Sequence, residues 1–135
     1  MNNPSVIPAF NYHDMASPFG DKVITTSLKV AEFFGKAHKN VLRAIKRLEA
    51  DCSQDFNRLN FEPVEYLNRK GELRVMYNIT KDGWMMLVMG FTGKAATAVK
   101  ESFIGAFNWM TERLNQRNAM QEDIQHRFAL KETRS

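Results

Sequence analysis

The sequence predicts a small α+β fold, and three observations carry that prediction. Two amphipathic helical segments are separated by the short link 35–37, which contains a glycine. An alternating apolar run follows the turn segment 68–71 and an apolar run precedes it, which is typical of a β-hairpin. Apolar residues then recur at steps of three and four over 94–117, the spacing of one helix face. With 135 residues, the chain suits one core, since domains usually hold ~100–150 residues.

Residues 1–22 are predicted to form a flexible N-terminal arm, because Asn, Pro, Ser and Gly mix with isolated apolar residues without any period. Residues 23–26 follow as a short β-prone run. Ser27 is a good N-cap for a helix of about two turns. Gly35 stands where a helix usually stops, so we expect this helix to end there.

The segment 38–51 is predicted to be the second helix of a helix-turn-helix motif. At ~100° per residue its apolar side chains fall on one side, namely Val41, Leu42, Ile45 and Leu48. Polar and basic side chains fall on the opposite side, namely Lys39, Asn40, Arg43, Lys46 and Arg47. Because His38 lies nearer the apolar side, we expect it to cap or pack at the helix start.

Residues 53–55 are polar, and a run over 61–66 follows with apolar residues at mixed spacing, in which Pro63 suits only an edge strand or a bulge. The turn 68–71 and the alternating segment 73–79 complete a predicted hairpin. Its tip carries a second basic cluster, Arg69, Lys70 and Arg74.

Thr80 is a predicted N-cap for a short apolar helix from Trp84 to about Met89, and residues 90–93 (GFTG) interrupt it. A long helix over about 94–117 follows. Polar residues 115–118 interrupt its apolar stripe, so 118–135 is predicted to be a helical extension or a tail. The expected division is therefore an arm (1–22), one domain (23–117) and this extension (118–135).

Composition and motifs exclude several classes of function. No apolar stretch reaches the ~20 residues of a membrane span, and the N-terminus lacks the pattern of a secretory signal. A single cysteine and three scattered histidines predict no disulfide and no metal site. Residues 90–95 lack the first glycine and the Ser/Thr of a phosphate-binding loop. We therefore expect a cytoplasmic protein that is not an enzyme and has no cofactor.

The positive charge of the chain is concentrated in one segment. The formal net charge is +4, and residues 23–50 hold six Lys or Arg against two acidic residues. A basic focus on one helix is typical of a nucleic-acid-binding surface. On charge alone, however, a solvated helix face is the better interpretation.

The order of these motifs resembles the phage regulatory protein Rha family. The resemblance rests on residues 76–84 (MYNITKDGW), 90–95 (GFTGKA) and 103–108 (FIGAFN), and upstream on 26–28 (TSL) and 30–36 (VAEFFGK). It covers about residues 24–110. It implies a temperate-phage or prophage regulator with a winged-helix-like DNA-binding domain, in which the helix-turn-helix is joined by a β-hairpin wing.

In such a domain the second helix enters the major groove and the wing reaches an adjacent strand or the minor groove. We therefore expect Asn40 and Arg43 to contact base edges, since these side chains can bind adenine and guanine in a bidentate manner. The expected phosphate contacts are Lys36, Lys39, Lys46 and Arg47, and those of the wing are Arg69, Lys70 and Arg74.

Two kinds of protein partner also follow as expectations. Helix-turn-helix proteins usually bind DNA as symmetric pairs, and the long helix is the natural place for a homodimer interface. The residues expected there are Phe103, Phe107, Met110 and Leu114. The competing hypothesis is an antirepressor-type module, which engages a phage or host repressor without DNA.

Overall fold

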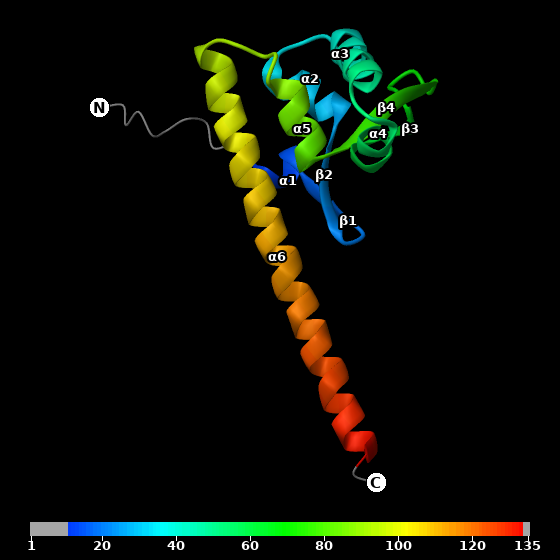
Figure 1. Ribbon diagram of the computed structural model, residues 1–135, viewed down its shortest axis with the longest axis vertical. Coiled ribbons are helices and arrows are strands. Elements are labelled where there is room, and N and C mark those ends of the chain that lie inside the picture. Colours follow the sequence, from blue (N-terminus) through cyan, green and yellow to red (C-terminus); the bar gives the residue numbers. More distant parts are fainter. Residues whose placement is uncertain (1–10, 134–135) are drawn as a thin grey trace, which may run out of the picture.

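The computed structural model describes residues 11–133, which form a globular body and a long helix that extends from it (Figure 1). Within these residues there are six helices and one four-stranded sheet, so the predicted α+β class is confirmed. In chain order the elements are α1 (Tyr12–Met15), β1 (Ser17–Phe19), β2 (Lys22–Thr26), α2 (Ser27–Phe34), α3 (His38–Asp51), α4 (Gln54–Asn60), β3 (Phe61–Leu67), β4 (Leu73–Thr80), α5 (Lys81–Val88) and α6 (Lys94–Thr133).

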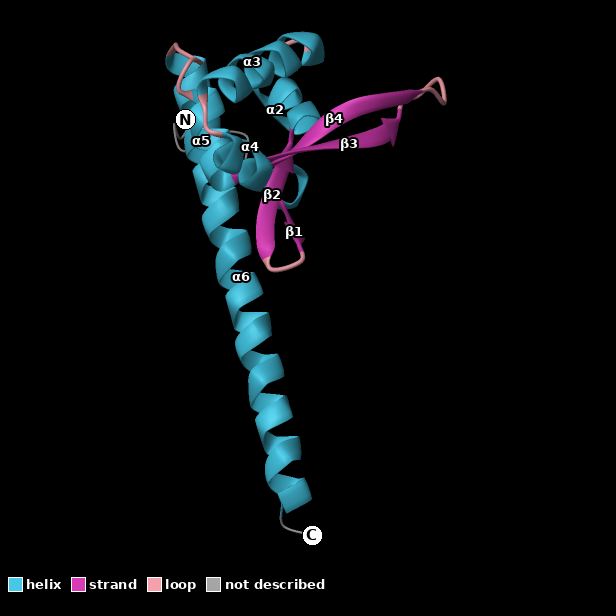
Figure 2. Cartoon of the chain, turned by 45° about the vertical axis from the view of Figure 1, so that its right-hand side comes forward, coloured by secondary structure: helices cyan, strands magenta, loops and turns pink. Residues whose placement is uncertain are grey.

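The strands form one antiparallel sheet in the order β1-β2-β4-β3. β3 and β4 pair along the whole of β3, from Phe61 opposite Ile79 to Leu67 opposite Leu73. β2 pairs only with the last three residues of β4, so the tip of the β3/β4 hairpin projects from the body (Figure 2). Pro63 lies on β3 at the edge of the sheet, as predicted, because an edge strand tolerates a missing N–H donor.

The core forms where α5 and the first half of α6 meet α2. Trp84 of α5 lies with its ring centroid 5.4 Å from that of Phe103 and 5.7 Å from that of Phe107, both on α6. Phe34 of α2 stacks on Phe103 at 5.7 Å. Since large buried aromatic rings contribute strongly to core stability, these contacts hold α2, and with it the short link to α3, against the body.

The expectation of a flexible arm is wrong for residues 11–22, whereas residues 1–10 lie outside the described part. These residues form α1 and β1, and Met15 is fully buried. The hydroxyl of Thr25 donates a hydrogen bond of 2.6 Å to the carbonyl oxygen of Met15, and the ring of Tyr12 lies 6.0 Å from that of Trp109 on α6. A segment this short shows no period in the sequence, so only its tertiary contacts reveal its order.

One local expectation needs correction, one helix was not predicted, and one of two alternatives is decided. The N-cap of α2 is Thr26, whose side chain accepts from the backbone N–H of Lys29, and Ser27 is the first helical residue. The polar residues after Cys52 form the start of α4, which is capped by Ser53 and was not predicted from the sequence. Finally, α6 continues to Thr133, so residues 118–133 form a helical extension rather than a tail. The segment 118–133 contains no Gly or Pro that would end the helix.

Other local signals are confirmed. α3 has the predicted bounds, and Gly35 adopts the left-handed conformation (φ 65°) that ends α2. The Thr80 side chain accepts from the N–H of Gly83 at the start of α5. These positions were predictable because caps and helix stops depend on nearest neighbours in the chain.

Candidate nucleic-acid interface

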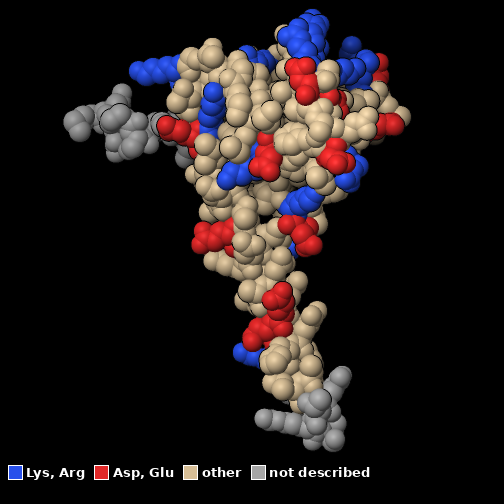
Figure 3. Space-filling model, viewed as in Figure 1, with Lys and Arg blue, Asp and Glu red and all other residues tan. Residues whose placement is uncertain are grey.

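One side of α3 is exposed and rich in basic side chains. Val41 and Ile45 on the other side are fully or almost fully buried, so the orientation of the helix follows the predicted apolar stripe. The exposed side chains are Lys39, Asn40, Arg43, Lys46 and Arg47. Lys and Arg gather over α3 in the space-filling view (Figure 3). The structure thus presents together the residues that the sequence assigned to base and phosphate contacts.

Two of these residues contact each other. Nη1 of Arg43 donates a hydrogen bond of 3.4 Å to Oδ1 of Asn40, one helical turn earlier. This bond lies at the long limit for a hydrogen bond, so both side chains keep donor and acceptor capacity for another ligand.

Lys36 lies in the link between α2 and α3 and contacts an aromatic ring. Its Nζ atom lies 4.5 Å from the ring centroid of Phe91, in the link between α5 and α6. Such a cation–π contact orients the lysine while its charge remains exposed. Lys36 therefore adds a positive charge just before the start of α3.

Buried polar contacts position the start of α3. The Oγ atom of Ser27 lies 2.9 Å from Nε2 of His38 and also accepts a 2.9 Å hydrogen bond from the N–H of Tyr77 on β4. This arrangement joins α2, α3 and the hairpin. Burial lowers the pKa of His38, so the neutral ring is favoured. His38 thus packs at the helix start, as expected, and the N-cap residue is Ala37.

A second contact links α3 to β4. The hydroxyl of Tyr77 donates a 3.1 Å hydrogen bond to Oε1 of Glu49. Burial and, secondarily, the Glu49 carboxylate raise the pKa of Tyr77, so its hydroxyl keeps the proton that it donates. Sequence reasoning did not identify Ser27, Tyr77 or Glu49 as positioning residues, because each contact joins segments far apart in the chain.

The hairpin turn is held by its own side chains. Oδ1 of Asn68 accepts hydrogen bonds of 2.9 Å from the N–H groups of Lys70 and Glu72. Arg74 forms an ion pair with Glu72 at 3.3 Å, which partly neutralises one of the three basic residues expected there. Arg69 and Lys70 are exposed at the tip.

The hairpin lies beside the start of α3. The ring of Tyr66, near the end of β3, lies 6.3 Å from the ring of His38 in an edge-on arrangement. This contact joins β3 to the start of α3, where Lys39 and Asn40 follow His38. Arg69 and Lys70 lie three and four residues beyond Tyr66, on the projecting turn (Figure 2).

The residues expected at a dimer interface lie elsewhere. Phe103 and Phe107 are fully or almost fully buried within the chain, and Met110 and Leu114 are 6% exposed. These side chains pack in the body of this same chain, so they offer no exposed face to a second copy. The physical reason is that α2, α5 and the N-terminal segment already cover this face of α6.

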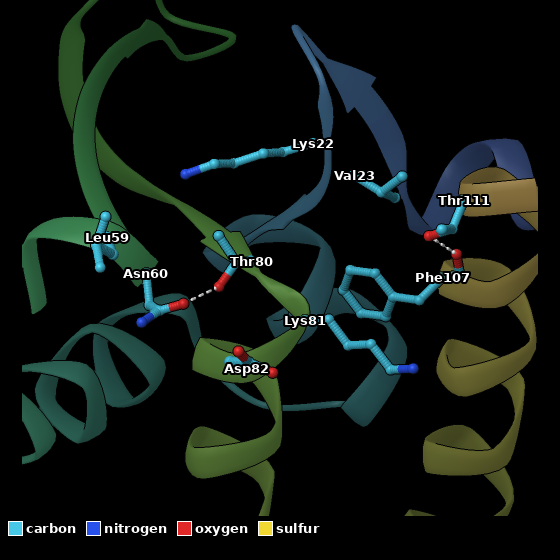
Figure 4. A pocket seen from close by; sticks show the side chains of 9 residues that line it. All are labelled: Lys22, Val23, Leu59, Asn60, Thr80, Lys81, Asp82, Phe107 and Thr111. Atoms are coloured by element: carbon cyan, nitrogen blue, oxygen red, sulfur yellow. Dashed lines mark hydrogen bonds between the residues drawn. The ribbon is translucent and has the colours of Figure 1, made fainter. Parts of the chain in front are cut away.

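Three pockets of the body are lined by residues outside α3. A pocket of about 390 Å³ lies where β2, α4, α5 and α6 meet (Figure 4). Its lining combines Lys22 and Lys81 with the Asp82 carboxylate and with apolar side chains. In the part of the chain that the structure describes, no three His, Cys, Asp or Glu side chains are grouped closely enough to hold a metal ion. Among the same residues, no helix has the length and apolar character to cross a membrane.

The fold and this surface define a small α+β protein with a basic helix beside a projecting hairpin. The chain belongs to the phage regulatory protein Rha family, whose characteristic sequence matches residues 25–112. This confirms the resemblance found from the motifs. The matched region contains α3, the hairpin, α5 and the buried half of α6.

Two curated relatives support this membership. An uncharacterized 22.8 kDa protein from the gp15-gp3 intergenic region of Salmonella phage P22 is 39% identical over 108 residues, which cover 78% of this chain and 53% of that protein. An uncharacterized protein of Haemophilus influenzae is 42% identical over 97 residues, covering 70% and 56%. The chain thus spans about half the length of these relatives. No solved structure matches it.

Proposed function

We propose that this phage regulatory protein binds double-stranded DNA, with α3 in the major groove and the β3/β4 hairpin as a wing, and thereby regulates transcription in the cytoplasm of a bacterial host. The observation that carries the proposal is the exposed basic side of α3, whose start contacts the hairpin through His38 and Tyr66. A helix fits the major groove, and exposed Lys and Arg supply the phosphate attraction that dominates affinity. The proposal includes no catalytic step and no cofactor.

Within this interface, Arg43 and Asn40 are assigned to base edges and the surrounding cations to phosphates. Lys39, Lys46 and Arg47 flank the pair on the same exposed side, and Lys36 precedes it. Arg69, Lys70 and Arg74 would follow the backbone from the wing. This division predicts different consequences for the two groups, because phosphate contacts carry no sequence information.

A fluorescence-anisotropy titration against salt tests the proposal, with regulatory-region DNA of the phage beside scrambled DNA of equal length. Arg43→Ala should lose about 10-fold of the preference for the regulatory DNA, the effect of one bidentate base contact. Lys46→Ala should weaken binding to both DNAs equally and reduce the salt slope by about one. The matched control is Arg127→Ala, which removes an exposed arginine from the far end of α6. Equal binding of both DNAs by the wild-type chain would contradict sequence-specific recognition.

One observation favours the alternative, a module that binds a phage or host repressor. Leu67 and Leu73 are directly paired near the hairpin tip, and each is 66% exposed. Such apolar side chains cannot bind phosphate groups, whereas a protein partner would bury them. Under this alternative, Leu73→Ser would abolish nuclease-resistant, salt-resistant binding to the purified repressor, and Arg43→Ala would not. Binding of the repressor by neither protein would contradict it.

A further inference from the structure

The part of α6 beyond Leu114 leaves the body and is exposed. We call residues 115–133 the stalk (Figures 1 and 2). Over 115–130 every residue is exposed except the partly buried Asn118. Large apolar side chains of the stalk are nevertheless exposed. Leu130 is 49% exposed, and the three others are Met120 at 66%, Ile124 at 44% and Phe128 at 63%.

These three side chains lie along one side of the helix. They follow one another at steps of four, the spacing that places side chains on successive turns of the same face. An isolated helix of about 12–15 residues is marginal in water, and packing of an apolar face usually supplies the missing stability. The stalk therefore has the length and the apolar face of a helix that packs on a partner.

The charge of the stalk favours a second copy of this chain over nucleic acid or lipid. Between 115 and 130, Arg117 and Arg127 balance Glu122 and Asp123, and Arg127 pairs with Asp123 at 3.1 Å. A segment without net charge offers no general attraction to phosphates, and helices that bind anionic membranes carry an excess of Lys and Arg on their polar face. A neutral face of mixed charges approaches its own copy without net repulsion.

The position of the stalk suits a parallel pair. α3 lies toward the end of the body away from the stalk (Figure 1), so parallel stalks would carry two bodies at one end with both α3 helices facing away from the stalks. One chain contains one α3, and two-fold DNA sites are read by two recognition helices about one helical turn of DNA apart. An antiparallel pair would instead send the two bodies to opposite ends.

We propose that the stalk pairs in parallel with the stalk of a second copy through Met120, Ile124 and Phe128. The pairing rests on the exposed apolar face and the balanced charge, whereas the parallel direction rests on the proposed DNA-binding function. The dimer contact is thus displaced along α6 from the buried residues expected from the sequence.

Sedimentation equilibrium of the full chain at increasing concentration tests the pairing. The wild-type chain should reach the mass of a dimer, and Ile124→Glu should raise the dissociation constant about 30-fold or more, as for loss of an interface anchor. The matched control is Ala119→Glu, which adds the same charge on the opposite side of the helix and should leave the dimer intact. An unchanged thermal unfolding midpoint of the Ile124→Glu body, followed by near-UV circular dichroism, excludes misfolding. A wild-type chain that stays monomeric, or equal loss in both variants, would overturn the proposal.

Disulfide formation distinguishes the two directions, in a chain that carries Cys52→Ser. In a parallel pair, two copies of the Phe128→Cys chain should form a disulfide between their residues 128, because these two positions then face each other. A mixture of Met120→Cys and Phe128→Cys chains that forms mainly the mixed disulfide would overturn the parallel direction.

The DNA titration separates failure of this inference from failure of the proposed function. A monomeric Ile124→Glu chain that still prefers a half-site of the regulatory DNA would support both. A dimeric wild-type chain that binds all DNA equally would overturn specific DNA recognition while leaving the pairing supported.

Discussion

The two halves of α6 show how one helix serves two different environments. From 94 to 114 its apolar stripe, which includes Phe103 and Phe107, is buried against α2, α5 and the N-terminal segment. From 115 onward Met120 and Phe128 stand in solvent although they have the same kind of spacing. The comparison teaches that helical periodicity identifies a face to be covered but not the molecule that covers it.

The largest expected contrast comes from truncating one phenylalanine in each half. Phe103→Ala removes a fully buried ring that packs on Phe33, Phe34 and Trp84, so the free energy of unfolding should fall by about 3–5 kcal/mol. Phe128→Ala should change it by less than about 0.5 kcal/mol, because the side chain is exposed in the single chain. Urea unfolding of dilute protein measures both values. Similar losses in the two variants would show that the stalk folds back on the body.

Two alanines, one in each half of α6, allow the same comparison with a smaller expected loss of stability. Ala106 is fully buried and Ala119 is exposed, and both lie inside α6. Replacing alanine by glycine in a helix costs about 1 kcal/mol locally. For Ala106→Gly this cost adds to a lost buried methyl group, so unfolding of the body should become easier by about 1–2 kcal/mol.

For Ala119→Gly the loss of helix stability should be confined to the stalk. Helical circular dichroism should decrease slightly while the urea midpoint of the body, followed by tryptophan fluorescence, stays unchanged. A shifted midpoint would mean that stalk and body unfold as one unit.

The smallest expected effect is a pH dependence that belongs to the body alone. Burial lowers the pKa of His38 from its ordinary value of 6.5, so the unfolded chain binds this proton more readily than the folded chain. The stabilising contribution is therefore complete above that value and is lost as the pH falls through the lower folded-state pKa. Unfolding free energies measured from neutral to mildly acidic pH should decline in wild type.

His38→Gln should flatten this decline, because glutamine does not titrate. His126→Gln, which removes a histidine from the stalk, is the control and should retain the wild-type slope. An equal slope in wild type and His38→Gln would assign the decline to other groups.

Much of the fold was predictable because its signals are local. The bounds of α3, the stop at Gly35, the cap at Thr80 and the hairpin all follow from residue types within a few positions of one another. α4 was missed although Ser53 is an ordinary N-cap, since a seven-residue helix is too short to show a clear period. Residues 11–22 were missed because their order depends on contacts with β2 and α6.

The candidate interface also has one part that was predictable from the sequence and one part that was not. The basic side of α3 was predictable, since the apolar stripe of an amphipathic helix determines which residues remain exposed. That the hairpin adjoins the same end of α3 depends on Tyr66, His38 and Ser27, and such contacts between distant segments leave no pattern in a single sequence.

By itself, the sequence determined the α+β class, the amphipathic faces, the family resemblance and the concentration of positive charge before and along α3. Those properties follow from composition, spacing and short motifs. Only the tertiary structure decided which apolar stripe is core and which is exposed. It placed Phe103, Phe107, Met110 and Leu114 inside the body and left Met120, Ile124 and Phe128 outside. The reason is that burial depends on which distant segments pack against a helix, and periodicity describes only the helix.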